Sequence, residues 1–212
     1  GSFINDSYCL PSNRMKYAIV YYRPENKFPN QVFGGVARNV KDPSKCSLDT
    51  FAYFHVKRPD GADPLLDTRY ELSDATAPDL EKLRSYYEEV SGGLMIRAFD
   101  LEPGNRGNDN LSEAYRKCGI HREKFLFSLR KNGRPSAVFM VHVADIGMNF
   151  SDLTNCIHAF VAEPEIVSKE AIQAVLANLS KHYDQQHVAV NLFPAYFAEK
   201  HGMALEKHYA LW

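Results

Sequence analysis

Two histidines on predicted strands are the first candidates for acid–base chemistry in this chain of 212 residues. His142 lies in the segment FMVHVAD and His158 in CIHAFVAE, and we expect these two strands to be neighbours with faces that can meet. The apolar residues around each imidazole are expected to lower its pKa by desolvation. Each histidine is therefore a candidate general base for proton transfer from a nucleophile. A core histidine that is hydrogen-bonded to the backbone is the alternative for both.

Other side-chain chemistries have less support in the sequence. Cys156 shares a strand face with His158, but no glycine-rich turn surrounds the two residues as it would around an activated nucleophile. The eight histidines form neither an H-x-x-x-H nor an H-E-x-x-H pattern, and His182 and His187 lie five residues apart across a helix end. We therefore predict no metal site.

The elements that must position these residues alternate between strand and helix after Arg69. Thr76 and Asp79 predict the start of a helix that ends at a pair of glycines, and a second short helix follows. The turn signal Asn132-Gly133 predicts a hairpin, after which we expect a strand, a helix, the strand VAVNLF, a helix and a last strand. Because VAVNLF shows almost no polar alternation, it is predicted to be central and covered on both sides.

Residues 1 to 66 are predicted to form an additional N-terminal unit of three strands. The strands are YAIVYY, QVFGGVA and LDTFAYFHV, and the breaker-rich stretch KRPDGADP separates them from a second unit, residues 67 to 212. The first unit can be aligned with the hairpin and strand that contain the two histidines, with Val32-Phe33 opposite Val138-Phe139. A partial repeat of one fold and a chance likeness between strands both remain open.

Composition excludes several classes of protein. The 25 Lys and Arg residues nearly balance the 26 Asp and Glu residues, so the charge favours neither nucleic acid nor an anionic membrane as a partner. No stretch has the roughly 20 consecutive apolar residues of a membrane helix. The four cysteines are far apart and form no C-x-x-C pair, which indicates reduced thiols in a cytoplasmic protein. Gly1-Ser2 is typical of the scar left by a removed tag, so we expect further natural sequence upstream.

The closing segment NLFPAYFAEKHGMALEKHYALW contains the pattern that resembles a known family. Asn191, Glu199, Lys200 and Gly202 match the spacing N-x-x-A-x-x-x-Y-E-K-x-G-F, with which many members of the GNAT superfamily (Gcn5-related N-acyltransferases) end. The order of strands and helices extends this resemblance over residues 69 to 212. The expected fold class is therefore α/β, with a mixed sheet of the GNAT type and the N-terminal β unit added to it.

The resemblance implies a place for an acyl donor. In GNAT folds two parallel strands splay apart, and the backbone groups exposed between them bind the pantetheine arm of an acyl thioester, from acyl-CoA or from an acyl carrier protein. The residues of this chain that fall there are Phe160, Val161, Ala162, Asn191 and Phe193. Asn191 could instead cap the helix that follows it. Glu163 falls near the position of a carboxylate base in the family, and a solvated loop carboxylate is its alternative.

Two departures from the family pattern concern the binding of coenzyme A and the protonation of the departing thiolate. The connection AEPEIVSKEA has no glycine, and Glu163, Glu165 and Glu170 place negative charge where the pyrophosphate of coenzyme A would lie. The tyrosine that often protonates the departing thiolate in the family aligns with Ala198. Tyr196, two residues earlier, is the substitute, and a helix would turn it elsewhere.

Two functions of different classes follow. The first is an N-acyltransferase that uses an atypical donor, such as an acyl carrier protein, with a small amine or a protein as acceptor. The second is a GNAT-like ligand-binding or regulatory module that has lost catalysis and forms part of a larger bacterial protein. A monomer and a homodimer are both compatible with the sequence.

Overall fold

The protein is described here from a computed structural model that places residues 17–56, 65–105, 110–145, 155–183, 189–203 and 205–212. These residues form an α/β fold around one eight-stranded mixed sheet, in the order β1-β8-β2-β7-β6-β5-β4-β3. The predicted α/β class is confirmed. The breaker-rich stretch that was predicted to separate two units, residues 57 to 64, lies wholly outside the described residues.

The sheet is antiparallel except at its centre. Its strands are β1 (Tyr21–Tyr22), β2 (Asp49–Val56), β3 (Tyr70–Asp74), β4 (Arg122–Lys131), β5 (Arg134–Ala144), β6 (Cys156–Val161), β7 (Ala189–Pro194) and β8 (Lys207–Leu211). Only the β6–β7 pair is parallel among the pairings of the described strands. β7 lies between β2 and β6, as its lack of polar alternation predicts. The β4–β5 hairpin turns at Asn132 and Gly133, both with positive φ, as predicted.

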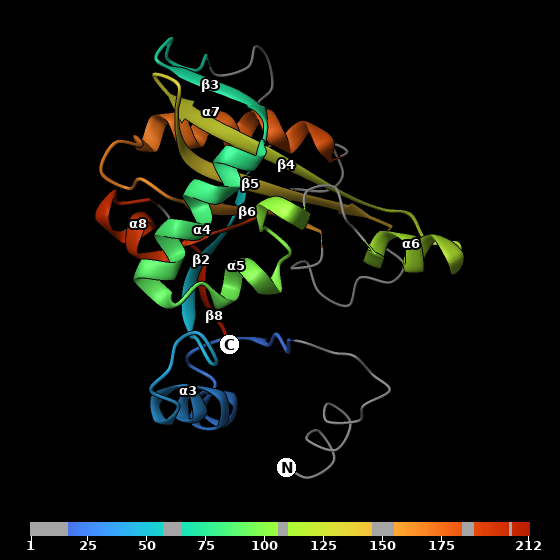
Figure 1. The fold of residues 1–212 in the computed structure, drawn as a ribbon, viewed down its shortest axis with the longest axis vertical. Coiled ribbons are helices and arrows are strands. Elements are labelled where there is room, and N and C mark those ends of the chain that lie inside the picture. The colour runs from blue at the N-terminus through green and yellow to red at the C-terminus, as the bar shows by residue number, and fades with distance from the viewer. Residues whose placement is uncertain (1–16, 57–64, 106–109, 146–154, 184–188, 204) are drawn as a thin grey trace.

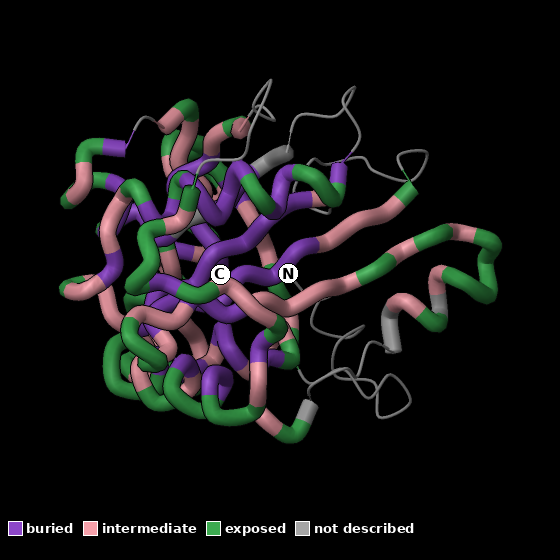
Figure 2. The backbone as a smooth tube through the Cα atoms, turned by 90° about the horizontal axis from the view of Figure 1, so that it is seen from above, coloured by how far each residue is buried: buried purple, intermediate pink, exposed green. Residues whose placement is uncertain are grey.

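Helices cover both faces of this sheet (Figure 1). On one face lie α4 (Ala77–Ser91) and α5 (Leu94–Ala98), and on the other lie α7 (Lys169–Leu179) and part of α8 (Ala195–Lys200). A further helix, α6 (Asn110–Lys117), precedes β4. Figure 2 shows the buried residues gathered in the middle of the molecule, between these layers. The result is a three-layer arrangement with a hydrophobic cluster on each side of the sheet.

Capping explains why α4 begins and ends where it does. The Asp79 carboxylate accepts hydrogen bonds from the Thr76 N–H at 2.6 Å and from the Thr76 hydroxyl at 2.7 Å. Gly92 follows the helix with a φ of 76°, the left-handed conformation that ends a helix at little cost for glycine. Both predicted ends of this helix are confirmed.

The predicted strand QVFGGVA is wrong. Gln31 to Ala37 are helical, within the continuous run of α2 (Lys27–Pro29), a π-helical turn (Asn30–Gly34) and α3 (Gly35–Asn39). Helical geometry places the Phe33 ring against Trp212 and Tyr22, at centroid distances of 5.1 and 6.0 Å. This packing overrides the strand propensity of valine and phenylalanine. The segment therefore differs from β5, with which the sequence alignment paired it.

The third strand of the N-terminal unit does form, and it enters the main sheet. β2 pairs with β7 over Phe51–Val56 and with β8 over Asp49–Tyr53. The two predicted units, residues 1 to 66 and 67 to 212, thus contribute strands to one sheet. None of the described helices is both long and apolar enough to cross a membrane.

Candidate functional site: the β6–β7 wedge

The parallel ladder between β6 and β7 is short. It pairs Cys156 with Val190, Ile157 with Asn191, and His158 with Leu192, and there it ends. Beyond this point β6 stays paired with β5 as far as Val161, while β7 stays paired with β2 as far as Pro194. Proline has no backbone N–H with which to extend the ladder. We call the region past His158 and Leu192, between the ends of the two strands, the wedge.

The backbone of β6 presents polar groups to the wedge. The Ala162 N–H donates to the Ser136 carbonyl on β5 at 2.9 Å, so Ala162 is turned away from β7. Because backbone groups alternate in direction along a strand, those of Val161 face β7. The Val161 carbonyl accepts a hydrogen bond of 3.5 Å from the Tyr196 hydroxyl, at the start of α8. A bond of this length is weak and can be displaced by a better donor.

Three tyrosines surround that carbonyl. The Tyr86 and Tyr196 hydroxyls lie 3.4 Å apart, and the Tyr86 and Tyr87 rings pack edge to face at 5.2 Å. Burial raises the pKa of Tyr196, and the neighbouring Tyr87 raises it further. Tyr196 therefore stays protonated at neutral pH and can donate a hydrogen bond or a proton. As expected, Tyr196 points away from the side of α8 that carries Ala198: Ala198 packs in the cluster under α7, whereas the Tyr196 hydroxyl lies beside Tyr86 on α4 and the Val161 carbonyl.

Glu163, at the end of β6, is held as an ion by two cations. Its Oε1 lies 3.0 Å from Lys82 Nζ on α4 and 2.8 Å from an Arg134 guanidinium nitrogen on β5. Burial alone would raise the pKa of Glu163, but the bonds from Lys82 and Arg134 outweigh it and leave this pKa lowered. A carboxylate held in this way is a poor general base near neutral pH. Its charge is also largely neutralised, which removes much of the repulsion expected from the sequence.

The connection from β6 to α7 has its polar groups engaged. Glu165 is bound by Lys200 Nζ at 2.8 Å. The Ser168 hydroxyl accepts the Ala171 N–H at 3.2 Å, and the Ser168 N–H donates to the Tyr70 hydroxyl at 3.1 Å. These two backbone N–H groups at the start of α7 are therefore bonded within the protein. The structure agrees with the sequence in offering no glycine-lined cradle for a pyrophosphate here.

The two histidines lie on one face of the sheet, as predicted, and His158 belongs to the last pair of the β6–β7 ladder, next to the wedge. Met140 pairs with His158, so His142 lies two residues further along β5, towards the other end of β6. An Arg122 guanidinium nitrogen lies 3.3 Å from His142 Nε2. His158 is 1% exposed and packs among Phe51, Phe99 and Phe160. Burial, assisted by His142, lowers the pKa of His158 to about 3.

This environment argues against a base or nucleophile at that position. A buried imidazole with so low a pKa is neutral at pH 7 and binds a proton poorly. Burial also raises the pKa of the Cys156 thiol to about 12, so almost no thiolate forms at neutral pH.

The residues expected to bind the donor arm divide between the two faces of the sheet. Phe160 and Ala162 belong to the hydrophobic cluster under α4 and α5, and Val161 to the cluster under α7. Asn191 is buried, and its side-chain nitrogen donates to the Phe54 carbonyl on β2 at 3.4 Å. It does not cap α8, which begins after Pro194 without a side-chain cap. Phe193 is placed by its backbone, opposite Ala52.

Three residues of the site were not found from the sequence. Lys82, Tyr86 and Tyr87 lie on adjacent turns of α4, where spacing alone indicates a helix with one face in the core. Their relation to Val161 and Glu163 depends on where α4 crosses the sheet, which local spacing does not determine.

No protein-family model and no curated protein matches the sequence. A solved structure, the X-ray structure of a Drosophila protein from a structural genomics consortium, aligns with 92% of this chain at 9% identity and a TM-score of 0.41. The chain spans 59% of the length of that protein. A likeness at this level assigns neither a family nor a function.

Proposed function

We propose that the protein is an N-acyltransferase of the GNAT type, which moves an acyl group from a thioester donor to an amine. The observation that carries the proposal is the early end of the β6–β7 ladder, with the Val161 carbonyl facing the wedge. A pantetheine amide is a better donor to this carbonyl than the Tyr196 hydroxyl at 3.5 Å. The arm would displace that contact and leave the hydroxyl beside the thioester.

Tyr196 supplies the acid in this proposal. The amine nitrogen attacks the thioester carbonyl, a C–N bond forms, the C–S bond breaks, and the leaving sulfur takes the proton of the Tyr196 hydroxyl. The raised pKa keeps the Tyr196 hydroxyl protonated at neutral pH as a hydrogen-bond donor to the sulfur, and it also makes transfer of the proton to a thiolate less favourable than from an unperturbed tyrosine. The amine proton passes to water, because His158 is buried and Glu163 is held by two cations. Tyr196 then recovers its proton from solvent.

An acyl carrier protein suits the donor role better than coenzyme A. The Ser168 and Ala171 N–H groups at the start of α7 already have partners, so they favour a donor whose phosphate stays outside the fold. Acyl-CoA remains the comparison donor, and a small amine or a protein is the acceptor. Among the described residues, Cys46 and Cys118 form no disulfide, which supports a cytoplasmic location for this reaction.

The second candidate is a ligand-binding or regulatory module of a larger bacterial protein, built on the same fold but without catalysis. This candidate is favoured because neither of the two expected bases, His158 and Glu163, is suited to accept a proton near neutral pH. His158 has a pKa of about 3, and Glu163 is ion-paired. Such a module would hold a thioester or another ligand at the wedge without turning it over.

Thiol release distinguishes the two candidates. The protein is mixed with octanoyl-CoA or an octanoyl carrier protein and a panel of amines, and the free thiol is measured. We expect release with the carrier protein, and Tyr196→Phe should slow it by about 100-fold, because general acid catalysis contributes at least this much. Tyr209→Phe is the control, since Tyr209 packs on Tyr53 in β2 and lies on β8, outside the wedge. Silence with both donors would refute transfer and favour the module.

A further inference from the structure

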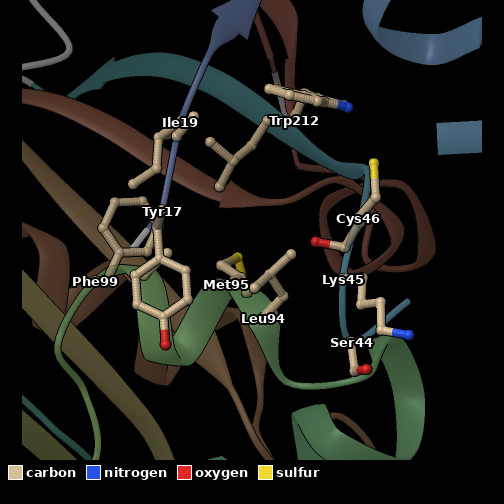
Figure 3. A pocket seen from close by; sticks show the side chains of 13 residues that line it. Tyr17, Ile19, Ser44, Lys45, Cys46, Leu94, Met95, Phe99 and Trp212 are labelled. Atoms are coloured by element: carbon tan, nitrogen blue, oxygen red, sulfur yellow. The ribbon is translucent and has the colours of Figure 1, made fainter. Parts of the chain in front are cut away.

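A cavity of about 360 Å³ lies on the α4 and α5 face of the molecule, apart from the wedge (Figure 3). It is enclosed by α5, by the last residues of β8 and by two N-terminal segments. Its lining residues are Tyr17, Ala18, Ile19, Ser44, Lys45, Cys46, Ser47, Leu94, Met95, Ala98, Phe99, Leu211 and Trp212. A volume of this size is within the range of small-molecule sites.

Most of the lining is apolar. Leu94, Met95 and Phe99 form one wall along α5, and Trp212 stands opposite them (Figure 3). Tyr17 and Ile19 are each 39% exposed, so this side of the cavity opens to solvent. Ligand sites of this kind bury a hydrocarbon body and fix its orientation with a few polar groups at one end.

The polar groups gather on one short loop, residues 44 to 47, which is held against the helices. An Arg97 guanidinium nitrogen donates to the Ser44 carbonyl at 3.1 Å and to the Gly92 carbonyl at 3.2 Å. Gly92 also permits close contact, because a β-carbon there would lie 2.6 Å from the Pro43 carbonyl carbon. The polar end of the cavity is thus fixed before any ligand arrives, which lowers the entropic cost of binding.

Lys45 is the charged residue of the lining. Its exposed ammonium lies 3.0 Å from the Asp42 carboxylate and points away from Met95 and Phe99 (Figure 3), so it reaches a ligand carboxylate only when the side chain turns. Asp42 also accepts hydrogen bonds from the Ser44 hydroxyl at 2.6 Å and from the Ser44 N–H at 3.1 Å. Asp42 therefore keeps two partners when Lys45 turns towards a ligand, and exposed ion pairs of this kind contribute little to stability.

We propose that this cavity binds a small amphipathic carboxylate, with its hydrocarbon body between α5 and Trp212 and its carboxylate at Lys45. The Ser44 and Ser47 hydroxyls of the same loop already donate to Asp42 and Asp49, so Lys45 is the group that binds the carboxylate. No residue of the wedge lines the cavity, so this site does not depend on the acyltransferase proposal.

Trp212 provides the readout, because it is the only tryptophan of the chain. Its fluorescence is followed while octanoate, methyl octanoate or octylamine is added to the full chain. We expect saturable changes with octanoate at lower concentrations than with the neutral ester or the cation. Lys45→Gln should weaken octanoate binding about tenfold, the size of one charge-assisted hydrogen bond, and leave the ester unaffected. The matched control is Lys41→Gln, because Lys41 is an exposed lysine of the same loop region.

A second variant tests the cavity itself. Ala98→Leu adds volume on the α5 wall and should abolish octanoate binding, while the circular dichroism spectrum and melting temperature show that the variant is folded. Equal binding of octylamine or the ester would overturn the carboxylate assignment. An absence of any saturable change with octanoate, or full binding by a folded Ala98→Leu variant, would overturn the site.

Discussion

At the scale of single residues, the partly buried Asp49 and the buried His158 have opposite effects on the pH dependence of stability. Burial raises the pKa of Asp49 to about 6, against the lowering effect of the Ser47 hydroxyl at 3.4 Å. Burial lowers the pKa of His158 to about 3. The unfolded chain binds a proton at His158 below about pH 6.5, so this residue destabilises the fold as the pH falls.

Asp49 changes the free energy of unfolding with pH in the opposite direction to His158, and a substitution at this residue measures its contribution by itself. The folded protein keeps Asp49 protonated up to about pH 6, whereas the unfolded chain loses this proton near pH 3.8. The free energy of unfolding therefore falls as the pH rises through this window, by as much as about 3 kcal/mol at pH 7. Asp49→Asn should raise the free energy of unfolding by up to that amount at pH 7 and change it little at pH 4. Urea unfolding at both pH values measures this, and equal effects at the two would contradict the assignment.

Sequence reasoning reached part of the site at this scale. It placed His142 and His158 on one face of neighbouring strands, because strand alternation fixes which side chains share a face. It expected Tyr196 to point away from the position of Ala198, as it does, but it missed the contacts of the Tyr196 hydroxyl with Tyr86 and Val161, because these depend on how α4 and β6 lie against α8. It also missed Lys82 as the partner of Glu163, since the two are 81 positions apart in the sequence.

At the scale of elements, a buried charge pair joins β4 to the start of α4. Arg130 donates to both Asp79 carboxylate oxygens, with a distance of 2.9 Å for its Nε to Oδ1, and to the Ser73 hydroxyl at 2.5 Å. Asp79 is 1% exposed and also holds the helix cap at Thr76. One carboxylate thus fixes both where the helix begins and how it lies on the sheet.

Removal of the cation should therefore be costly. Arg130→Met keeps the apolar stem but leaves the Asp79 carboxylate buried without its ionic partner, and we expect a loss of about 3–5 kcal/mol. Arg84→Met is the control, because Arg84 pairs with Glu81 and Glu88 on the exposed side of α4 and should cost less than about 1 kcal/mol. Urea denaturation measures the free energy of unfolding of both variants. Similar losses for the two would show that the buried pair stabilises the fold no more than the exposed pairs do.

Elements with clear local signals were predictable from the sequence. Caps and glycines marked α4, and Asn132-Gly133 marked the β4–β5 hairpin. The segment 31 to 37 was not predictable, because its helix is stabilised by Phe33 packing on Trp212, the far end of the chain. The short α5 was missed as well, since five residues are too few to establish a helical period.

At the scale of the whole molecule, β2 joins β8, near the C-terminus, to β7 in the middle of the sheet. It lies between β7 and β8 and pairs with both, so the only strand of the described sheet that separates those two comes from the first 66 residues. Local sequence patterns predicted a strand here but not its neighbours, because pairing between distant segments leaves no local signal.

This arrangement predicts that residues 67 to 212 do not fold alone. Without residues 1 to 66, β7 loses β2 from one edge, and β8 loses both of its neighbours, β1 and β2. We expect the truncated chain to lack cooperative thermal unfolding and to bind a hydrophobic dye. The full chain is the control, and a synthetic peptide of residues 45 to 58 added in trans should restore part of the transition. A sharp transition of the truncated chain by itself would refute the prediction.

The occupancy of the wedge is the central claim, and backbone amide NMR tests it most directly. A stable thioether, S-octyl pantetheine, is titrated into ¹⁵N-labelled protein, and the chemical shift changes are mapped along the chain. The account predicts that the largest saturable changes fall on the amides of Ala159 to Val161, where β6 leaves the ladder with β7. Changes confined to α5 and the cavity beside it, or no saturable change at all, would contradict it.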